Sequence, residues 1–253
     1  MSDFDRNPAA ARGYPADRAV AIDQGLRAHM IRVYNYMAGG VALTGAIAWI
    51  TFQYAAVTND AGAIVGLTSF GQTLFQGPMM WVLILAPLGL VFFLSFRIDR
   101  LEASTARALF FVYAGLLGIS LASIFMVYTQ ASIARVFFIS AASFGALSLW
   151  GYTTQRDLTG MGSFLIMGLF GLIIAMVVNM FLKSSGLDWA LSVMGVLIFA
   201  GLTAWDTQKI KEYYDPMDDG TVAGRKVVMG ALALYLDFIN LFLMLLRLIG
   251  DRR

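Results

Sequence analysis

Seven long apolar runs dominate this 253-residue chain and decide what it can fold into. Each has about 20 residues, the length that an α-helix needs to cross the hydrocarbon core of a bilayer. They cover roughly residues 33–57, 78–96, 108–128, 131–152, 162–182, 188–207 and 227–249. Only 13% of the residues are charged, against about 25% in a typical soluble domain. We therefore predict an all-α integral membrane protein with seven transmembrane helices, in one membrane domain over residues 33–249.

Polar segments flank this domain at both ends. Residues 1–32 carry five Arg and four Asp, which is too polar and too mixed in sign for a secretory signal peptide. We expect a cytosolic tail there, partly disordered around Pro8, Gly13 and Pro15. Residues 250–253 form a short C-terminal tail.

Positive charge sets the expected orientation in the membrane. Thirteen Lys and Arg residues lie on one side, in the segments 1–32, 97–107, 153–161 and 208–226. The loops of the other side carry only Lys183. Because the loops of a membrane protein that are rich in Lys and Arg usually lie in the cytoplasm, we expect a cytoplasmic N-terminus. After seven spans, the C-terminus is then outside. Arg247, Arg252 and Arg253 oppose this arrangement, and the alternative is a last run that re-enters without crossing.

Two aspartates lie where a membrane helix should have none. Asp206 ends the sixth run, and Asp237 lies ten residues inside the seventh. A charge at the middle of a bilayer costs about 2.5–3.5 kcal/mol, so such residues usually face a cavity, a partner or an ion path. In the expected orientation Asp206 is near the cytoplasmic end, and Asp237 is ~15 Å deep. Asn240, three residues later, adds a neutral polar group on the same helix face.

Two carboxyl groups in a medium of low dielectric tend to share one proton. When both are ionised, their oxygens can bind Ca²⁺, Mg²⁺ or Mn²⁺. In the alternative interpretation only Asp237 is buried, and Asp206 is interfacial, hydrogen-bonded to Thr203 or a Lys. Arg97 ends the second run at a similar depth, so it is a candidate salt-bridge partner of Asp206. Its alternative role is that of an interfacial anchor.

Several kinds of chemistry are excluded by composition. The chain has no Cys, its single His29 precedes the spans, and the last run has no internal Lys. These facts exclude a Cys metal site, an intramembrane Ser–His pair, a bis-His haem and a retinal Schiff base. No nucleotide-binding loop or HExxH motif occurs, and we expect no nucleic-acid partner. An intramembrane aspartyl protease would also use two aspartates, but Leu234-Tyr235-Leu236-Asp237 departs from the Gly-x-Gly-Asp of those enzymes. We expect a non-enzymatic protein without a cofactor.

The sequence around each aspartate resembles the Bax inhibitor-1 (TMBIM) family, including its bacterial YccA-like members. The matching stretches are Thr203-Ala204-Trp205-Asp206-Thr207-Gln208-Lys209 and Leu234-Tyr235-Leu236-Asp237-Phe238-Ile239-Asn240-Leu241-Phe242-Leu243. The resemblance covers about residues 30–249.

This resemblance implies a seven-helix fold with the final helix at its centre. It also implies a pH-sensitive calcium leak in a bacterial inner membrane, with Asp206 and Asp237 as sensor and calcium as permeant or bound ion. Arg97 matches an arginine that salt-bridges the sixth-helix aspartate in the closed form. Arg247 matches a latch arginine of the final helix. The latch partner is an acid on the second helix, and residues 78–96 contain no Asp or Glu.

The sequence is also consistent with a second function. Some members of that family act as partners of membrane proteases. The chain would then be an interaction protein that modulates a membrane-anchored ATP-dependent protease, with the segment 1–32 as the contact. The expected partners are thus the lipid bilayer, calcium ions and protons, with such a protease as the alternative.

Overall fold

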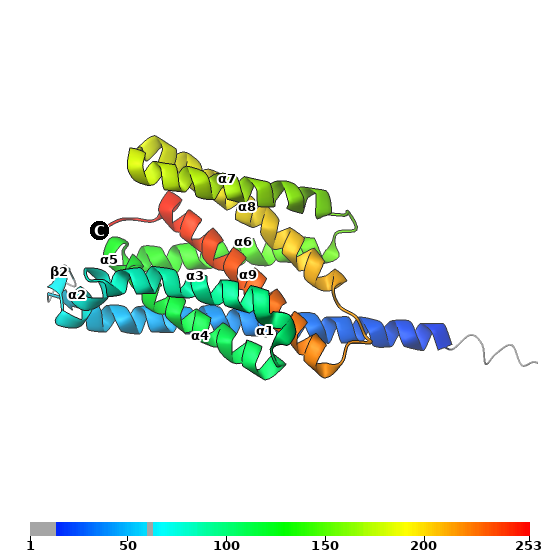
Figure 1. Ribbon diagram of the computed structural model, residues 1–253. Coiled ribbons are helices and arrows are strands. Elements are labelled where there is room, and N and C mark those ends of the chain that lie inside the picture. Colours follow the sequence, from blue (N-terminus) through cyan, green and yellow to red (C-terminus); the bar gives the residue numbers. More distant parts are fainter. Residues whose placement is uncertain (1–13, 60–62) are drawn as a thin grey trace, which may run out of the picture.

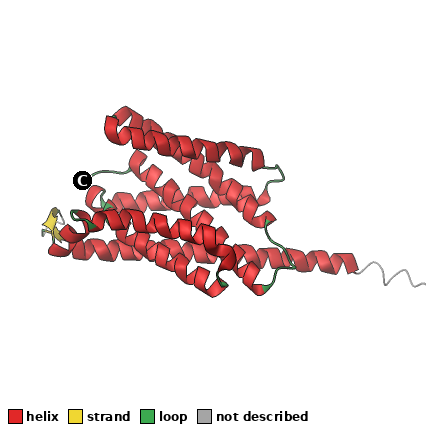
Figure 2. Ribbon diagram, in the orientation of Figure 1, coloured by secondary structure: helices red, strands yellow, loops and turns green. Residues whose placement is uncertain are grey.

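Helices make up nearly all of the computed structural model, which describes residues 14–59 and 63–253, with side chains from residue 24 (Figure 2). Six helical segments are long and apolar enough to cross a membrane by length and composition: Met79–Arg100, Ala103–Val127, Gln130–Thr153, Thr159–Leu182, Ser185–Glu212 and Gly220–Ile249. They coincide with the second to seventh predicted runs. The expectation of an all-α membrane protein is confirmed for these six segments, and the count of seven is not.

The first helix, α1 (Tyr14–Ala55), is longer than the first apolar run predicts. It begins inside the segment expected to be a tail, and Pro15 stands in its first turn, where a missing N–H costs nothing. The expected boundary at residue 32 is therefore not a break in the helix. Pro8 and Gly13 lie outside the described residues. The N-terminal part of α1 projects beyond the other helices (Figure 1).

The connection after α1 contains a short sheet that was not predicted. Strands β1 (Ala56–Thr58) and β2 (Ile64–Leu67) pair antiparallel, with Ala56 opposite Leu67. Helix α2 (Ser69–Phe75) follows, and the hydroxyl of Thr68 accepts from the Gly71 amide to cap it.

The remaining helices form the bundle. They are α3 (Met79–Arg97), the 3-10 turn η1 (Ile98–Arg100), α4 (Ala103–Leu121), α5 (Ile124–Val127), α6 (Gln130–Thr153), α7 (Thr159–Leu182), α8 (Ser185–Glu212) and α9 (Gly220–Ile249). Helix α9 packs against α1, α4, α6 and α8. Fourteen of its residues are buried, whereas α7 buries only Gly162 and Leu172. The final helix is thus the core of the bundle, as the family resemblance implies.

The bundle has two distinct ends. The α3–α4, α6–α7 and α8–α9 connections lie at the end from which α1 projects (Figure 1); we call it the basic end. The β-hairpin, the α7–α8 turn and the C-terminus lie at the opposite end. There Asp251 forms an ion pair of 2.9 Å with Arg135 of α6, and its amide donates to the hydroxyl of Ser132. The C-terminal residues are therefore tied to α6.

Candidate functional site

Asp237 lies at the centre of the bundle, on the helix that the other helices surround. Its side chain is 5% exposed, and its Oδ2 atom is buried without a hydrogen-bond partner among the described residues. Asn240 does not satisfy it, because the Asn240 amide donates to the Leu236 carbonyl of its own helix at 2.9 Å. A buried polar atom without a partner is costly, and such an atom usually has a functional reason.

Asp206 of α8 faces Asp237 across the α8–α9 contact. Its side chain is half-buried, and the two carboxyl groups are within hydrogen-bonding reach of each other. An ionised carboxylate can only accept hydrogen bonds, so a bond between the two groups needs a proton on one of them. Asp206 makes no hydrogen bond with Thr203, whose hydroxyl donates to Phe199 O at 2.7 Å. The arrangement suits a pair that holds one proton.

A hollow of about 320 Å³ leads from the basic end to Asp206 but not to Asp237. We call it the vestibule. Its charged and titratable lining residues are His29, Asp99, Asp206, Lys209, Tyr213, Arg225 and Lys226. Asp206 therefore stands between the vestibule and the buried carboxyl group, and an ion or proton arriving from this end meets Asp206 first.

The basic residues that line the vestibule form an ion pair, a hydrogen bond and a cation–π contact with neighbouring segments. Lys226 pairs with Asp218 at 2.5 Å, and Arg225 Nε donates to the carbonyl of Leu101 at 2.5 Å. These two bonds tie the start of α9 to the α8–α9 turn and to the α3–α4 connection. Lys209 lies over the ring of Trp205, 4.8 Å from its centroid, a cation–π contact.

His29 closes the vestibule from the side of α1. It is 6% exposed, its ring centroid lies 5.6 Å from that of Tyr214, and its Nε2 atom has no partner among the described residues. Burial lowers the pKa of His29, and the positive charges of Lys226 and Arg32 lower it further, while Asp218 raises it. His29 is thus held toward its neutral form.

The two arginines named from the resemblance form no ion pair with any residue that the structure describes. Arg97 ends α3, is exposed, and makes no ion pair within 4.0 Å among the described residues, so no salt bridge joins it to Asp206. Arg247, in the last turn of α9, makes no such pair in the described part of the chain either. It lines a hollow at the opposite end together with Lys183 and with Asp188 of α8. The acid that shares this hollow with Arg247 is therefore on α8 and not on α3.

A chain of hydroxyl groups next to the aspartates was not predicted. Thr207 donates to the Thr203 carbonyl at 2.7 Å, and its Oγ1 lies 2.9 Å from that of Ser148. The Ser148 hydroxyl in turn bonds the hydroxyl of Tyr34. Since each hydroxyl has one proton, Tyr34 donates to Ser148 and Ser148 to Thr207. These bonds link α1, α6 and α8 at Thr207, the residue after Asp206. The sequence feature that could have predicted them is the presence of the polar residues Ser148 and Thr207 within apolar runs.

The described residues contain no group of three or more His, Cys, Asp or Glu side chains placed to hold a metal ion. Calcium takes six to eight oxygen ligands, and the two aspartates supply at most four oxygens. The pair could contact a calcium ion that keeps part of its water shell. By itself it is too small a set for a resident calcium ion.

Comparisons with known proteins show what the chain as a whole is similar to. A family model described as "Inhibitor of apoptosis-promoting Bax1" matches residues 26–253. The inner membrane protein YbhL of Escherichia coli is 45% identical over 240 residues, which cover 94% of this chain and 97% of that protein. An uncharacterized protein of Rickettsia prowazekii is 48% identical over 91% of this chain and 92% of its own length. A Caulobacter vibrioides protein is 44% identical over the full length of both.

Proposed function

Because the chain belongs to the Bax inhibitor-1 family of membrane proteins, we propose that it is a pH-sensitive, calcium-permeable leak channel of a bacterial inner membrane. The observation that carries the proposal is the contact between the half-buried Asp206 and the buried Asp237 behind it. A pair that holds one proton can be switched by pH, and the vestibule gives it access from one end of the bundle.

In this proposal α1 is the first of seven spans. It packs along α4 and α9, and its 33–55 part lies beside helices that are long enough to cross the membrane. The basic end then faces the cytoplasm, following the positive-inside rule. The N-terminus is cytoplasmic and the C-terminus is outside.

Labelling of single cysteines tests the span count, since the chain has none of its own. In intact spheroplasts, Ser2→Cys is expected to resist a membrane-impermeant maleimide until the cells are lysed. Arg253→Cys is expected to react at once, because an odd number of spans puts the termini on opposite sides. Equal labelling of the two variants would mean an even number of spans and would contradict the seven-span arrangement.

The proposed gate works through the charge of the pair. At low pH Asp206 and Asp237 share a proton and stay together. When the proton leaves, two negative charges in a medium of low dielectric repel each other and attract a cation. Ionised Asp206 is then free to pair with Arg97, which requires the end of α3 to approach α8. The unpaired Arg97 belongs, in this scheme, to the proton-sharing form.

Calcium flux into vesicles tests the proposal. The purified full-length chain is reconstituted in vesicles that contain a calcium-sensitive dye, with the membrane potential clamped, and influx is followed from pH 5 to pH 8. We expect influx above that of protein-free vesicles, with a clear dependence on pH. Influx that is absent would favour the interaction-protein function, and influx that does not respond to pH would contradict the sensor role of the pair.

A further inference from the structure

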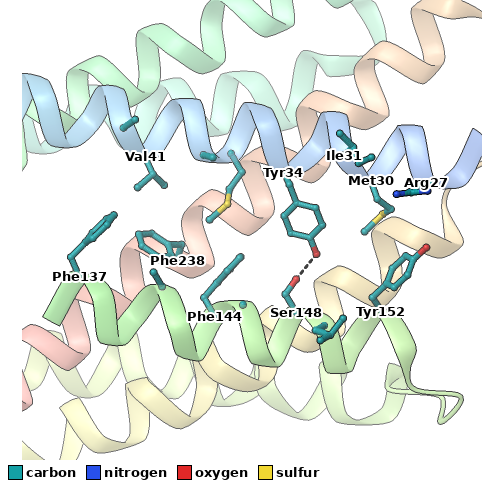
Figure 3. Close-up of a pocket in the computed structure, with 16 residues that line it drawn as sticks. Arg27, Met30, Ile31, Tyr34, Val41, Phe137, Phe144, Ser148, Tyr152 and Phe238 are labelled. Atoms are coloured by element: carbon teal, nitrogen blue, oxygen red, sulfur yellow. Dashed lines mark hydrogen bonds between the residues drawn. The ribbon is translucent and has the colours of Figure 1, made fainter. Parts of the chain in front are cut away.

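A long groove lies between α1 and α6, and the hydrogen bond between the hydroxyl groups of Tyr34 and Ser148 bridges it (Figure 3). The two helices both pack against α9, and a hollow of about 690 Å³ lies between them (Figure 3). Its polar lining residues are Arg27, Tyr34, Ser148 and Tyr152, and the rest of its wall is apolar. Phe137, Phe144 and Phe238 form one wall, with Val41 facing them from α1 (Figure 3).

This hollow continues into a second one of about 400 Å³. The two share Val41, Phe137 and Phe238, and the second extends to Trp49 and Gln130 at the opposite end. From Arg27 to Trp49 the groove follows α1 for 22 residues, or ~33 Å at 1.5 Å per residue. That length is close to the ~30 Å thickness of the hydrocarbon core of a bilayer. The groove therefore crosses the apolar layer from one side to the other.

Charge is distributed unevenly along the groove. Arg27 is exposed at the basic end, and among the side chains that the structure describes, from residue 24 on, no Asp or Glu lines either hollow. Lys211 lies beside the same end, since its Nζ donates to the Tyr152 carbonyl at 2.9 Å and sits 5.3 Å from the centroid of the Tyr152 ring. Glu212 is the neighbouring acid and is exposed. A long apolar cleft with cationic groups at one end complements a lipid with an anionic headgroup.

We propose that the α1–α6 groove retains one anionic phospholipid, with an acyl chain between Val41 and the Phe137–Phe144–Phe238 wall and its phosphate at Arg27. The acyl chain gains dispersion contacts with the side chains of α1, α6 and α9, which a lipid on a flat surface lacks. It also contacts Phe238, the residue after Asp237. This inference needs only that the chain is embedded in a membrane and does not rest on calcium transport.

Gly145 offers a way to fill the groove without disturbing the fold. It lines the first hollow, and a Cβ placed on it would meet no atom within 4 Å. Gly145→Phe should therefore occupy the space of the acyl chain. Gly171 on α7 is an exposed glycine with equally open surroundings and lines no hollow described above. Gly171→Phe is the matched control, and Ala38→Leu fills the groove from α1.

Native mass spectrometry of the full-length chain in detergent, titrated with dioleoyl-phosphatidylglycerol or the corresponding phosphatidylcholine, tests the proposal. We expect the wild type and Gly171→Phe to retain one phosphatidylglycerol in preference to phosphatidylcholine. Gly145→Phe and Ala38→Leu should weaken retention at least about tenfold, since displacing two or three buried methylene groups removes that much affinity. Arg27→Gln should remove the headgroup preference, whereas Arg156→Gln, an exposed arginine at the same end, should keep it.

Three outcomes would overturn the proposal. The first is equal retention by Gly145→Phe, Ala38→Leu and Gly171→Phe when each is monodisperse and helical. The second is equal retention of the two lipids by the wild type, which would show that the groove does not select an anionic headgroup. The third is a wild type that retains no lipid, or that appears as a dimer without lipid, because a segment of this chain or a second copy would then fill the groove.

Discussion

Asp237→Asn is expected to abolish the pH dependence of calcium flux in reconstituted vesicles. Asparagine has the size of the protonated acid and carries a permanent donor, so it can bond Asp206 at every pH. Flux should then stay constant from pH 5 to pH 8, near the value of the wild type at the acidic end. Because one proton equilibrium can shift populations about tenfold per pH unit, the lost response should amount to at least about tenfold across this range.

Asp99→Asn provides the control for this experiment. Asp99 lines the vestibule with Asp206 but is not one of the two carboxyl groups in contact. Its neutralisation should alter the magnitude of the flux and leave its pH dependence in place. A pH response of wild-type size in Asp237→Asn, with a wild-type elution profile and helicity, would mean that the pair is not the sensor.

Much of the membrane domain was predictable, because hydropathy depends only on composition along the chain. Six of the seven apolar runs coincide with helices of membrane-spanning length. The start of α1 could not be predicted from hydropathy because residues 14–32 are polar. A polar helix that projects from the bundle contains no apolar run. The β-hairpin was missed for a related reason. Its segment is rich in Gly and Thr and has no alternating pattern of the kind that predicts a strand.

The candidate site was also predictable only in part. Asp206 and Asp237 were evident from the sequence, since acids are rare in apolar helices. Their contact could not be predicted, because it depends on how α8 and α9 are rotated against each other. Arg97 and Arg247 were named by position in the chain, and position does not determine a partner. The vestibule was hidden too, because it is assembled from four elements far apart in sequence.

Close packing between α6 and α8 is what fixes Asp206 in its place opposite Asp237. Gly151 of α6 lies against the backbone of Ala204, two residues before Asp206, and a Cβ on Gly151 would overlap the Ala204 carbonyl oxygen. Because that neighbour is backbone, it can give way only if the whole helix moves. Small residues at such crossings allow membrane helices to approach closely.

Gly151→Ala is therefore expected to destabilise the protein by about 1–3 kcal/mol, the usual cost of overpacking. In a chain of this size, at about 2–4 °C per kcal/mol, the apparent Tm in detergent should fall by roughly 2–12 °C. Gly145→Ala is the matched control on the same helix, because a Cβ there meets open space; it should leave the Tm unchanged or slightly raised. Equal Tm values for the two variants would show that α6 and α8 can separate at little cost. Where Gly151→Ala still folds, the shift of α8 should also weaken the pH response of calcium flux, since it changes the position of Asp206 relative to Asp237.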